Sequence, residues 1–366
     1  MQYMITYEQA LEIVSAVSFR VEPERIGFME TTGRILSEDI ASDIEMPPFD
    51  KSAVDGYACR NSDILNELEV IEVIPAGKAP EKEIRKNQCA KIMTGAPLPI
   101  GSDAVIMVED VEEINHNRIR YKKEKVKNNI CFKGEDIRKG EVVIKAGTLI
   151  QPQHIAVMAT AGCVNPMVYR RIKVAVISTG DELVEPEVIP SVSQIRNSNA
   201  YQLLTQAGKI GMDAEYVGIA SDNEVSTRET IARAFNKADV VLLTGGVSMG
   251  DFDYVPQVLS DLGVEIKFKS IAVQPGRPTV FGTRGNQFIF GLPGNPVSSF
   301  VQFELLVKPL IYKISGYNYQ PLKIKIPIEK EFNRKRSDRL SIVPVQINED
   351  GEVMALEYHG SAQINS

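Results

Sequence analysis

The sequence is poor in the residues that bind transition metals or cross-link small domains. Its 366 residues include four cysteines, three histidines and no tryptophan. The cysteines lie dozens of residues apart and form no CxxC pair. Neither a zinc site nor a disulfide framework is therefore expected.

Long apolar runs and a basic net charge are also missing. No apolar segment approaches the ~18 residues that a membrane-spanning helix needs, and the first residues do not have the pattern of a signal peptide. A net charge of −7 argues against a general nucleic-acid binder, although a local basic pocket stays possible. Because the hydrophobic and charged fractions are ordinary, we expect a cytoplasmic enzyme that binds neither nucleic acid nor membranes.

The length predicts two or three domains, at about 150 residues each. Thr6–Gln9 has a capping-box pattern and is followed by apolar residues at helical spacing. Paired prolines after Met46 mark a domain boundary. From 58 to 140 the pattern is one of short strands and turns, with a hairpin tip at 115–117, and a helix is predicted over 153–161.

Beyond Arg171 the pattern changes to alternating strands and helices. Strands are predicted at 174–178, 214–219, 240–243 and 288–292, and helices at 199–207, 224–235, 255–262 and 296–313. This alternation is typical of βαβ units, so we expect an α/β domain with a doubly wound, mostly parallel sheet.

Polar and glycine-rich loops follow each predicted strand of this sheet. They are Thr179–Glu182, Ser221–Asn223, Gly245–Asp253 and Leu292–Pro296. Ligands of open α/β sheets bind at the carboxyl ends of the strands, so these loops would line one crevice. Each acid also has an ordinary explanation, because Asp222 and Asp253 could be helix N-caps and Glu182 a solvated turn residue.

The composition of this crevice indicates anion chemistry. Amides of the glycine loop and of the Asn295–Pro296 turn suit a phosphate, while facing carboxylates would need a hard cation such as Mg²⁺ between them. We therefore expect metal-assisted chemistry on a phosphorylated small molecule. The candidate cationic partners are Arg277, Lys267, Lys269 and Lys51. For Lys267 and Lys269 a solvated surface charge is the better interpretation.

One motif points to a different enzyme class. Gly246-Val247-Ser248-Met249-Gly250 matches the G-x-S-x-G nucleophile elbow of α/β-hydrolases. An elbow needs a helix that begins at the serine, whereas Pro256 and two aspartates indicate a later start. The only histidine downstream is His359, so we reject a hydrolase.

Eight segments together resemble one family, the molybdopterin molybdenumtransferases. In chain order they are MPPFDKSAVDGYA, IMTGAPLP, KGEDI, STGDEL, IRNSN, LLTGGVSMGDFDYV, VQPGRPTVFG and GLPGNPVSSF. They extend from Met46 to Phe300. Any one of them is weak evidence, but eight in register are specific.

The resemblance implies a homodimer of four-part, multidomain α/β subunits. The implied parts are a linking domain (1–45 and 140–170), a β-rich domain (46–139), a molybdopterin-binding α/β domain (171–317) and a small C-terminal β-barrel (318–366). The last segment is short for the family's barrel, so we expect it to be incomplete. The resemblance also implies that the β-rich domain of the other subunit covers the crevice.

The implied reaction inserts molybdate into the dithiolene of adenylylated molybdopterin, with Mg²⁺-dependent loss of AMP. The molybdopterin adenylyltransferase that makes this substrate would be a partner. The implied catalytic residues are Asp55, Thr94, Asp136, Glu182, Asp222 and Asp253, of which Glu182, Asp222 and Asp253 would hold the metal. The implied substrate-binding residues are Gly245, Gly246, Ser248, Gly250, Arg277, Pro293, Gly294, Asn295, Pro296 and Ser298.

Two positions depart from the family pattern. Gln274 stands where members often carry lysine, and Arg277 stands where lysine is usual, so one expected anion contact differs. Two rival functions are a molybdopterin adenylyltransferase, which would not need residues 1–170, and a gephyrin-like scaffold, for which no added interaction region is evident.

Overall fold

A computed structural model describes residues 4–247, 254–333 and 338–356. Its contacts divide the chain into two compact units. The first unit comprises Met1–Glu38, Gly147–Gln151 and Met167–Ser366, and the second comprises Asp39–Ala146 and Pro152–Pro166. None of the helices within the described ranges is both long and apolar enough to cross a bilayer.

The first unit is built on a six-stranded sheet with the order β16-β13-β17-β21-β20-β18. The strands are β13 (Lys173–Thr179), β16 (Asp213–Ala220), β17 (Val240–Thr244), β18 (Glu265–Phe268), β20 (Val280–Arg284) and β21 (Gln287–Leu292). The first four strands in this order are parallel, and β20 pairs antiparallel with both β21 and β18, so β18 runs in the same direction as the first four. The predicted doubly wound, mostly parallel sheet is confirmed. The prediction missed β18 and β20, which lie at one side of the sheet.

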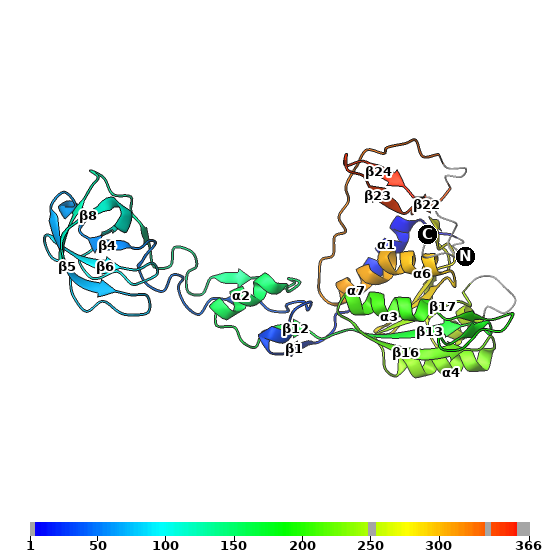
Figure 1. Cartoon of the computed structure of the whole chain (residues 1–366). Coiled ribbons are helices and arrows are strands. Elements are labelled where there is room, and N and C mark those ends of the chain that lie inside the picture. The colour runs from blue at the N-terminus through cyan, green and yellow to red at the C-terminus, as the bar shows by residue number, and fades with distance from the viewer. Residues whose placement is uncertain (1–3, 248–253, 334–337, 357–366) are drawn as a thin grey trace. The chain divides into compact units, whose positions relative to one another are not determined.

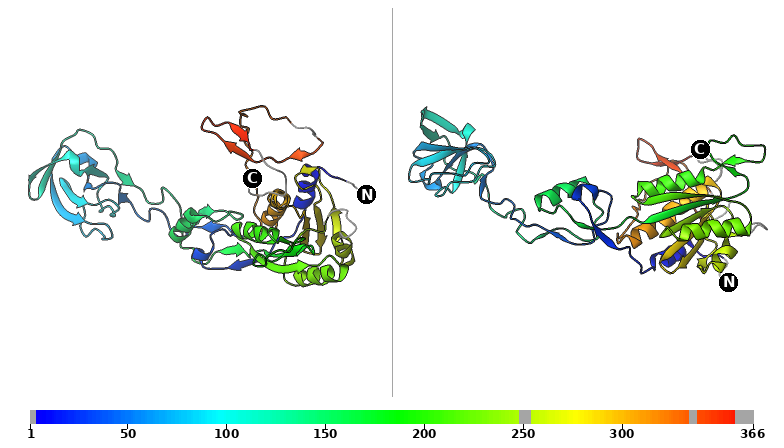
Figure 2. Two further views of the ribbon diagram at one scale, coloured as in Figure 1. Left: turned by 45° about the vertical axis from the view of Figure 1, so that its right-hand side comes forward. Right: turned by 90° about the horizontal axis from the view of Figure 1, so that it is seen from below.

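Helices cover both faces of this sheet (Figures 1 and 2). One face packs against α1 (Tyr7–Ser15), α3 (Asn199–Lys209), α6 (Pro296–Gln302) and α7 (Lys308–Ile314); the other packs against α4 (Glu224–Phe235) and α5 (Val255–Asp261). Strand residues alternate between the two cores: Val174 and Val176 contact the first, and Ala175 and Ile177 contact the second. Burial on both faces explains why these strands are continuous apolar runs.

Helix boundaries follow local sequence signals. The capping box predicted for α1 is present, since Thr6 and Gln9 exchange side-chain and backbone hydrogen bonds. The single helix predicted over 296–313 is instead interrupted by η4 (Phe303–Val307), a π-helical turn between α6 and α7. Such a turn changes the direction in which the following side chains point.

The second unit contains a six-stranded sheet of its own, with the order β7-β4-β6-β5-β9-β8. Its strands are β4 (Gly56–Cys59), β5 (Glu67–Ile74), β6 (Gln88–Ile92), β7 (Ala104–Met107), β8 (Val111–Asn115) and β9 (Arg118–Tyr121). Strands β8 and β9 form the predicted hairpin around 115–117, and α2 (Pro152–Thr160) matches the predicted helix. The unit is β-rich, as expected.

Short strand pairs and turns complete the two units. The pairs are β1 (Pro23–Arg25) with β12 (Met167–Tyr169), β2 (Ile40–Ala41) with β11 (Val142–Ile144), β3 (Lys51–Ser52) with β10 (Ile130–Cys131), β14 (Leu183–Val184) with β15 (Ile195–Arg196), β19 (Val273–Gln274) with β22 (Leu340–Ser341), and β23 (Val345–Ile347) with β24 (Val353–Ala355). The 3₁₀ turns are η1 (Phe28–Glu30), η2 (Asn61–Asp63) and η3 (Val108–Asp110). In the described part of 318–356 no closed barrel is formed by β22, β23 and β24.

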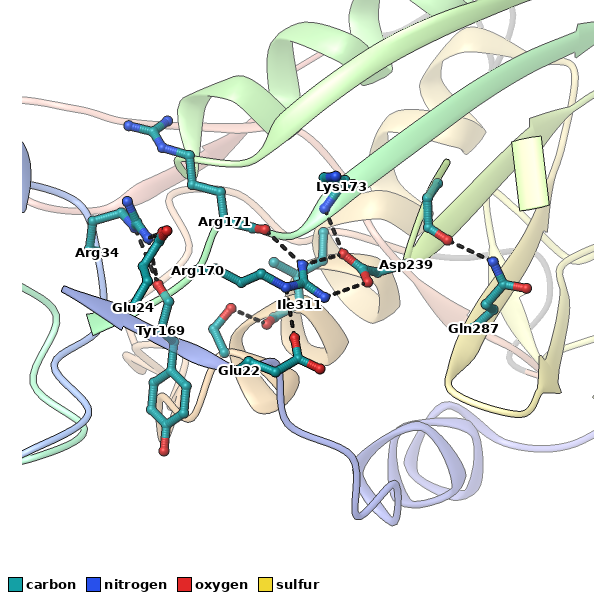
Figure 3. A network of polar contacts seen from close by, with 12 residues as sticks. Glu22, Glu24, Arg34, Tyr169, Arg170, Arg171, Lys173, Asp239, Gln287 and Ile311 are labelled. Carbon is teal, nitrogen blue, oxygen red and sulfur yellow. Dashed lines mark hydrogen bonds and ion pairs between the residues drawn. The ribbon is translucent and has the colours of Figure 1, made fainter. Parts of the chain in front are cut away.

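A polar network anchors the chain where it enters β13. Figure 3 shows the Arg170 guanidinium between the carboxylates of Glu22 and Asp239. Both carboxylate oxygens of Asp239 accept hydrogen bonds from Arg170 at 2.8 Å, and the Lys173 amide donates to Asp239 at 2.9 Å. The network thereby joins β12, β13 and the turn before β17.

Candidate functional site

A cavity of about 340 Å³ lies at the carboxyl ends of β13, β17 and β21. Its walls also come from β14, β15 and the start of α3. The lining residues are Ser178, Thr179, Glu182, Leu183, Ile195, Arg196, Asn197, Ser198, Asn199, Thr244, Gly245, Gly294, Asn295 and Pro296. The predicted location of the site at this edge of the sheet is therefore matched by a real cavity.

A larger hollow of about 660 Å³ lies at the opposite edge, around the amino ends of β13 and β16. Its charged lining includes Lys173, Glu215 and Lys237, and Lys237 already forms an ion pair with Glu215 at 2.8 Å. The glycine loops do not reach this hollow. We therefore assign the functional site to the smaller cavity, where the loops after several strands converge.

Glycine is required where two loops of the cavity meet. Gly245 has a φ of +91°, and a Cβ there would lie 2.5 Å from the carbonyl oxygen of Thr179. A Cβ added at Gly294 would lie 3.7 Å from the Cα of Gly245. The glycines thus let the loops after β17 and β21 pack against the end of β13. The Gly245 N–H donates to the Leu292 carbonyl at 3.1 Å, and the Gly294 carbonyl accepts from Asn199.

The acids follow neighbouring strands but have different surroundings. Glu182 lines the cavity, and its carboxylate folds back against Gly180. Asp222 lies in the loop after β16, where its carboxylate accepts a hydrogen bond from the Asp181 amide. Asp222 is not a helix cap, because Asn223 caps α4 by accepting from the Ser226 amide.

The predicted metal ligands form no ready-made cluster. Among the residues that the structure describes, no group of three His, Cys, Asp or Glu side chains is close enough to hold a metal ion. Asp253, the third predicted ligand, lies outside the described residues, as do Ser248 and Gly250. What the structure describes is one cavity carboxylate, Glu182, with Asp222 in the next loop.

The remaining predicted binding residues lie around the cavity or in the loop before β20. Gly245, Gly294, Asn295 and Pro296 line the cavity itself. Gly246 and Pro293 adjoin these residues in sequence, and the buried Ser298 follows Pro296 by two residues.

Arg277 is exposed in the loop that precedes β20. Because β20 is antiparallel to β21, this loop lies at the carboxyl edge of β21. Gln302 holds the loop by donating a hydrogen bond to the Pro275 carbonyl at 3.1 Å.

Lys267 pairs with Glu265 at 2.6 Å on the surface, which confirms the surface interpretation for this residue.

Sequence reasoning missed two buried asparagines of the cavity. Asn197 and Asn199 are 2% and 8% exposed and belong to the IRNSN segment. The segment carried the family resemblance, but nothing in its spacing indicated buried amides. Their location depends on the turn between β15 and α3, which only the folded chain shows.

The second unit holds three predicted catalytic residues. Thr94 donates hydrogen bonds from its backbone amide and its hydroxyl to the same oxygen of Asp55, both at 2.7 Å. These bonds, the backbone one first, lower the pKa of Asp55. Asp136 is exposed in a turn whose amides bond the Met46 carbonyl. All three residues are accessible on the surface of this unit.

Comparison with known families covers most of the chain. A family described as the MoeA N-terminal region (domain I and II) matches residues 5–162. A second, described as a probable molybdopterin binding domain, matches residues 175–313 and therefore includes the cavity.

Individual proteins give the same result. The chain is 35% identical to the molybdopterin molybdenumtransferase of Staphylococcus epidermidis, covering 98% of this chain and 91% of that protein. It is 38% identical to the Haemophilus influenzae protein of the same name, over 86% of this chain and 78% of that one. A crystal structure of the molybdopterin biosynthesis moeA protein from Pyrococcus horikoshii OT3 matches with a TM-score of 0.85 and 30% identity, over 99% and 92% of the two chains.

Proposed function

Because this chain belongs to the molybdopterin molybdenumtransferase family and is a transferase of molybdenum cofactor biosynthesis, we propose that it inserts molybdate into the dithiolene of adenylylated molybdopterin. AMP is released in this reaction, which depends on Mg²⁺. Molybdate and the adenylylated pterin are the substrates.

The observation that carries this proposal is the cavity at the carboxyl ends of β13, β17 and β21. It combines the backbone of Gly245 and Gly294 with one carboxylate, that of Glu182. A glycine-rich turn at the end of a strand lets the phosphate end of a nucleotide-like substrate approach the backbone closely, because no Cβ stands in the way. A carboxylate beside such a turn is the kind of oxygen ligand that a hard cation needs next to phosphate.

The carboxylates at this edge of the sheet are the kind of ligand that suits Mg²⁺. Mg²⁺ in proteins usually keeps several waters and is bound by one or two carboxylates together with substrate phosphates. Glu182 and Asp222 supply oxygen donors of that kind, and a three-acid cage is not needed. We propose that Glu182, Asp222 and Asp253 hold the ion, which when bound would neutralise charge on the departing AMP.

The chain's own residues would then bind and orient the substrates. Loops containing Gly245 and Gly294 would bind the substrate with their backbone groups, and Arg277 would attract an oxyanion from the loop before β20. Pro293 and Pro296 would fix the shape of the loop after β21.

Assembly is part of the proposal. We propose a homodimer in which Asp55, Thr94 and Asp136 act in the active site of the partner subunit. The exposed, hydrogen-bonded pair of Asp55 and Thr94 supports a task outside the core of the second unit. The molybdopterin adenylyltransferase would supply the substrate, and the four-part domain division of the family is adopted as a prediction.

The test mixes the protein with adenylylated molybdopterin, molybdate and Mg²⁺ and measures AMP and active cofactor. Both products are expected with the wild type, and neither when Mg²⁺ or molybdate is left out. Asp222→Ala and Asp253→Ala should lose activity. Asp213→Ala is the matched control, because Asp213 is an exposed acid at the amino end of β16. Absence of AMP with the wild type, or full activity of both site variants, would refute the proposal.

A further inference from the structure

Three polar side chains of the cavity have their hydrogens already committed to the protein. They are Ser178, Thr244 and Asn199, which we call the acceptor wall. Ser178 is 0% and Thr244 is 2% exposed. The direction of each hydrogen bond around them is fixed by groups that can only donate or only accept.

The hydroxyl of Ser178 donates to the side-chain oxygen of Asn197 at 3.0 Å. The orientation of this Asn197 amide is not arbitrary, because the backbone N–H of Ala200 also donates to the same oxygen. A backbone N–H can only donate. Asn197 therefore turns its oxygen toward Ser178, and Ser178 keeps only lone pairs for a ligand.

The other end of the Asn197 amide is fixed as well. Its nitrogen donates to the hydroxyl of Tyr216 at 2.9 Å, and Tyr216 donates to Glu185 at 2.7 Å. Tyr201 donates to the second oxygen of the Glu185 carboxylate. Burial, followed by the bond to Glu185, raises the pKa of Tyr216, so Tyr216 stays a donor. The three bonds from Ser178 to Asn197, from Asn197 to Tyr216 and from Tyr216 to Glu185 are thus all donated in the direction of the carboxylate.

Asn199 is fixed by the loop after β21. Its nitrogen donates to the Gly294 carbonyl at 2.6 Å and to the Thr244 hydroxyl at 2.9 Å. Thr244 in turn donates to the Pro293 carbonyl at 3.3 Å. The side-chain oxygen of Asn199 is buried and has no hydrogen-bond partner among the described residues. An unpaired buried acceptor costs free energy that a ligand N–H can recover.

We propose that the acceptor wall binds the N–H edge of the pterin ring, its amino group and ring N–H, and that phosphate and molybdate do not bind against these three side chains. The inference rests on the proposed function only for the identity of the ring. Ser178, Thr244 and Asn199 offer oxygen lone pairs, and Glu182 adds a carboxylate to the same cavity. A phosphate or molybdate oxygen facing these groups would be repelled, whereas a ring N–H would be bound.

Two small pteridines test this proposal. Pterin carries an amino group where lumazine carries an oxygen, so the pair differs by a donor against an acceptor. Titrations by calorimetry, at a pH where both rings are uncharged and keep their N–H groups, should show pterin binding about tenfold or more tighter than lumazine. Inorganic phosphate should leave the affinity for pterin unchanged.

Variants locate the effect. Ser178→Ala leaves Asn197 paired with Ala200 and should weaken pterin binding several-fold while lumazine binding changes little. Asn199→Leu should reduce the preference for pterin further. The matched control is Ser315→Ala, since Ser315 is another buried serine that donates to a helix carbonyl in α7.

Several outcomes would overturn the proposal. They are equal affinity for the two rings, no binding of pterin by the wild type, competition by phosphate, or unchanged preference in correctly folded Ser178→Ala. None of these depends on AMP release. A wild type that forms cofactor but does not discriminate the rings refutes only this inference, and one that discriminates without forming cofactor refutes only the proposed reaction.

Discussion

Asp181 and Asp222 exchange hydrogen bonds: the backbone N–H of each donates to the carboxylate of the other, at 3.2 and 3.1 Å. The two residues belong to the loops after β13 and β16, which are neighbouring strands. The exchange ties these loops together at the carboxyl edge of the sheet. Asp222 therefore has a structural task besides the metal-binding one proposed for it.

Two substitutions of Asp222 separate these tasks. In Asp222→Asn the amide oxygen can still accept from Asp181, so the loop is retained while the charge is lost. We expect AMP release to fall by at least about tenfold with an unchanged melting temperature. Asp222→Ala should lose the same activity and also about 0.5–1.5 kcal/mol of stability. Full activity in the asparagine variant would leave Asp222 with the structural task alone.

Periodicity predicted the sheet well because its strands are buried on both faces. The run Val240–Leu243 is apolar throughout, and all of it is buried. In the missed strand β18, Glu265 and Lys267 alternate with apolar residues as in a half-buried strand, but the segment is only four residues long. Its pairing with β20 depends on residues far along the chain, which no local window contains.

The candidate site was only partly accessible to sequence reasoning. Glu182, Gly245 and Gly294 were placed together because each follows a parallel strand, and they do line one cavity. Asn197 and Asn199 were not singled out, since an asparagine in a polar segment is usually exposed. Their burial results from packing of α3 against the loop after β21, which is a tertiary contact.

The pair formed by Thr94 and Asp55 makes a prediction about pKa. The backbone N–H of Thr94 and then its hydroxyl lower the pKa of Asp55. Thr94→Val removes the hydroxyl bond, so the pKa of Asp55 should rise part of the way to its ordinary value. Thr94→Ser keeps both donors and should leave the pKa unchanged. Carboxyl NMR titration measures both, and an equal pKa in all three proteins would contradict the assignment.

The ion pair of Arg170 and Asp239 predicts a stability effect in the first unit (Figure 3). Asp239 accepts three hydrogen bonds in a half-buried position. Asp239→Ala leaves Arg170 and the Lys173 amide short of a partner, and should cost about 2–4 kcal/mol. The control Lys237→Ala breaks an exposed pair with Glu215 and should cost about 0–1 kcal/mol. Urea unfolding measures both, and similar values would contradict the prediction.

The same carboxylate predicts a pH dependence. Burial acts to raise the pKa of Asp239, but the bonds from Arg170 and the Lys173 amide outweigh it, and the net pKa is lowered. The stabilisation is therefore complete above the unfolded pKa of about 3.9 and is lost as the pH falls below it. As the pH is lowered from 5 to 3, the free energy of unfolding of Asp239→Asn should therefore fall less than that of the wild type. Parallel curves for the two proteins would exclude Asp239 as the titrating group.

The proposed dimer predicts complementation between two inactive variants. In the proposed dimer each active site combines the first unit of one subunit with the second unit of its partner. Asp55→Ala damages the second unit and Glu182→Ala the first. In a mixed dimer one site therefore carries both defects and the other carries neither. Random exchange of subunits should restore about a quarter of wild-type activity, because half the dimers are mixed and each has one intact site. The control mixes Glu182→Ala with Asp222→Ala, which both lie in the first unit, and should restore none. If mass spectrometry shows mixed dimers of the first pair but AMP release stays absent, Asp55 does not act in the partner's site.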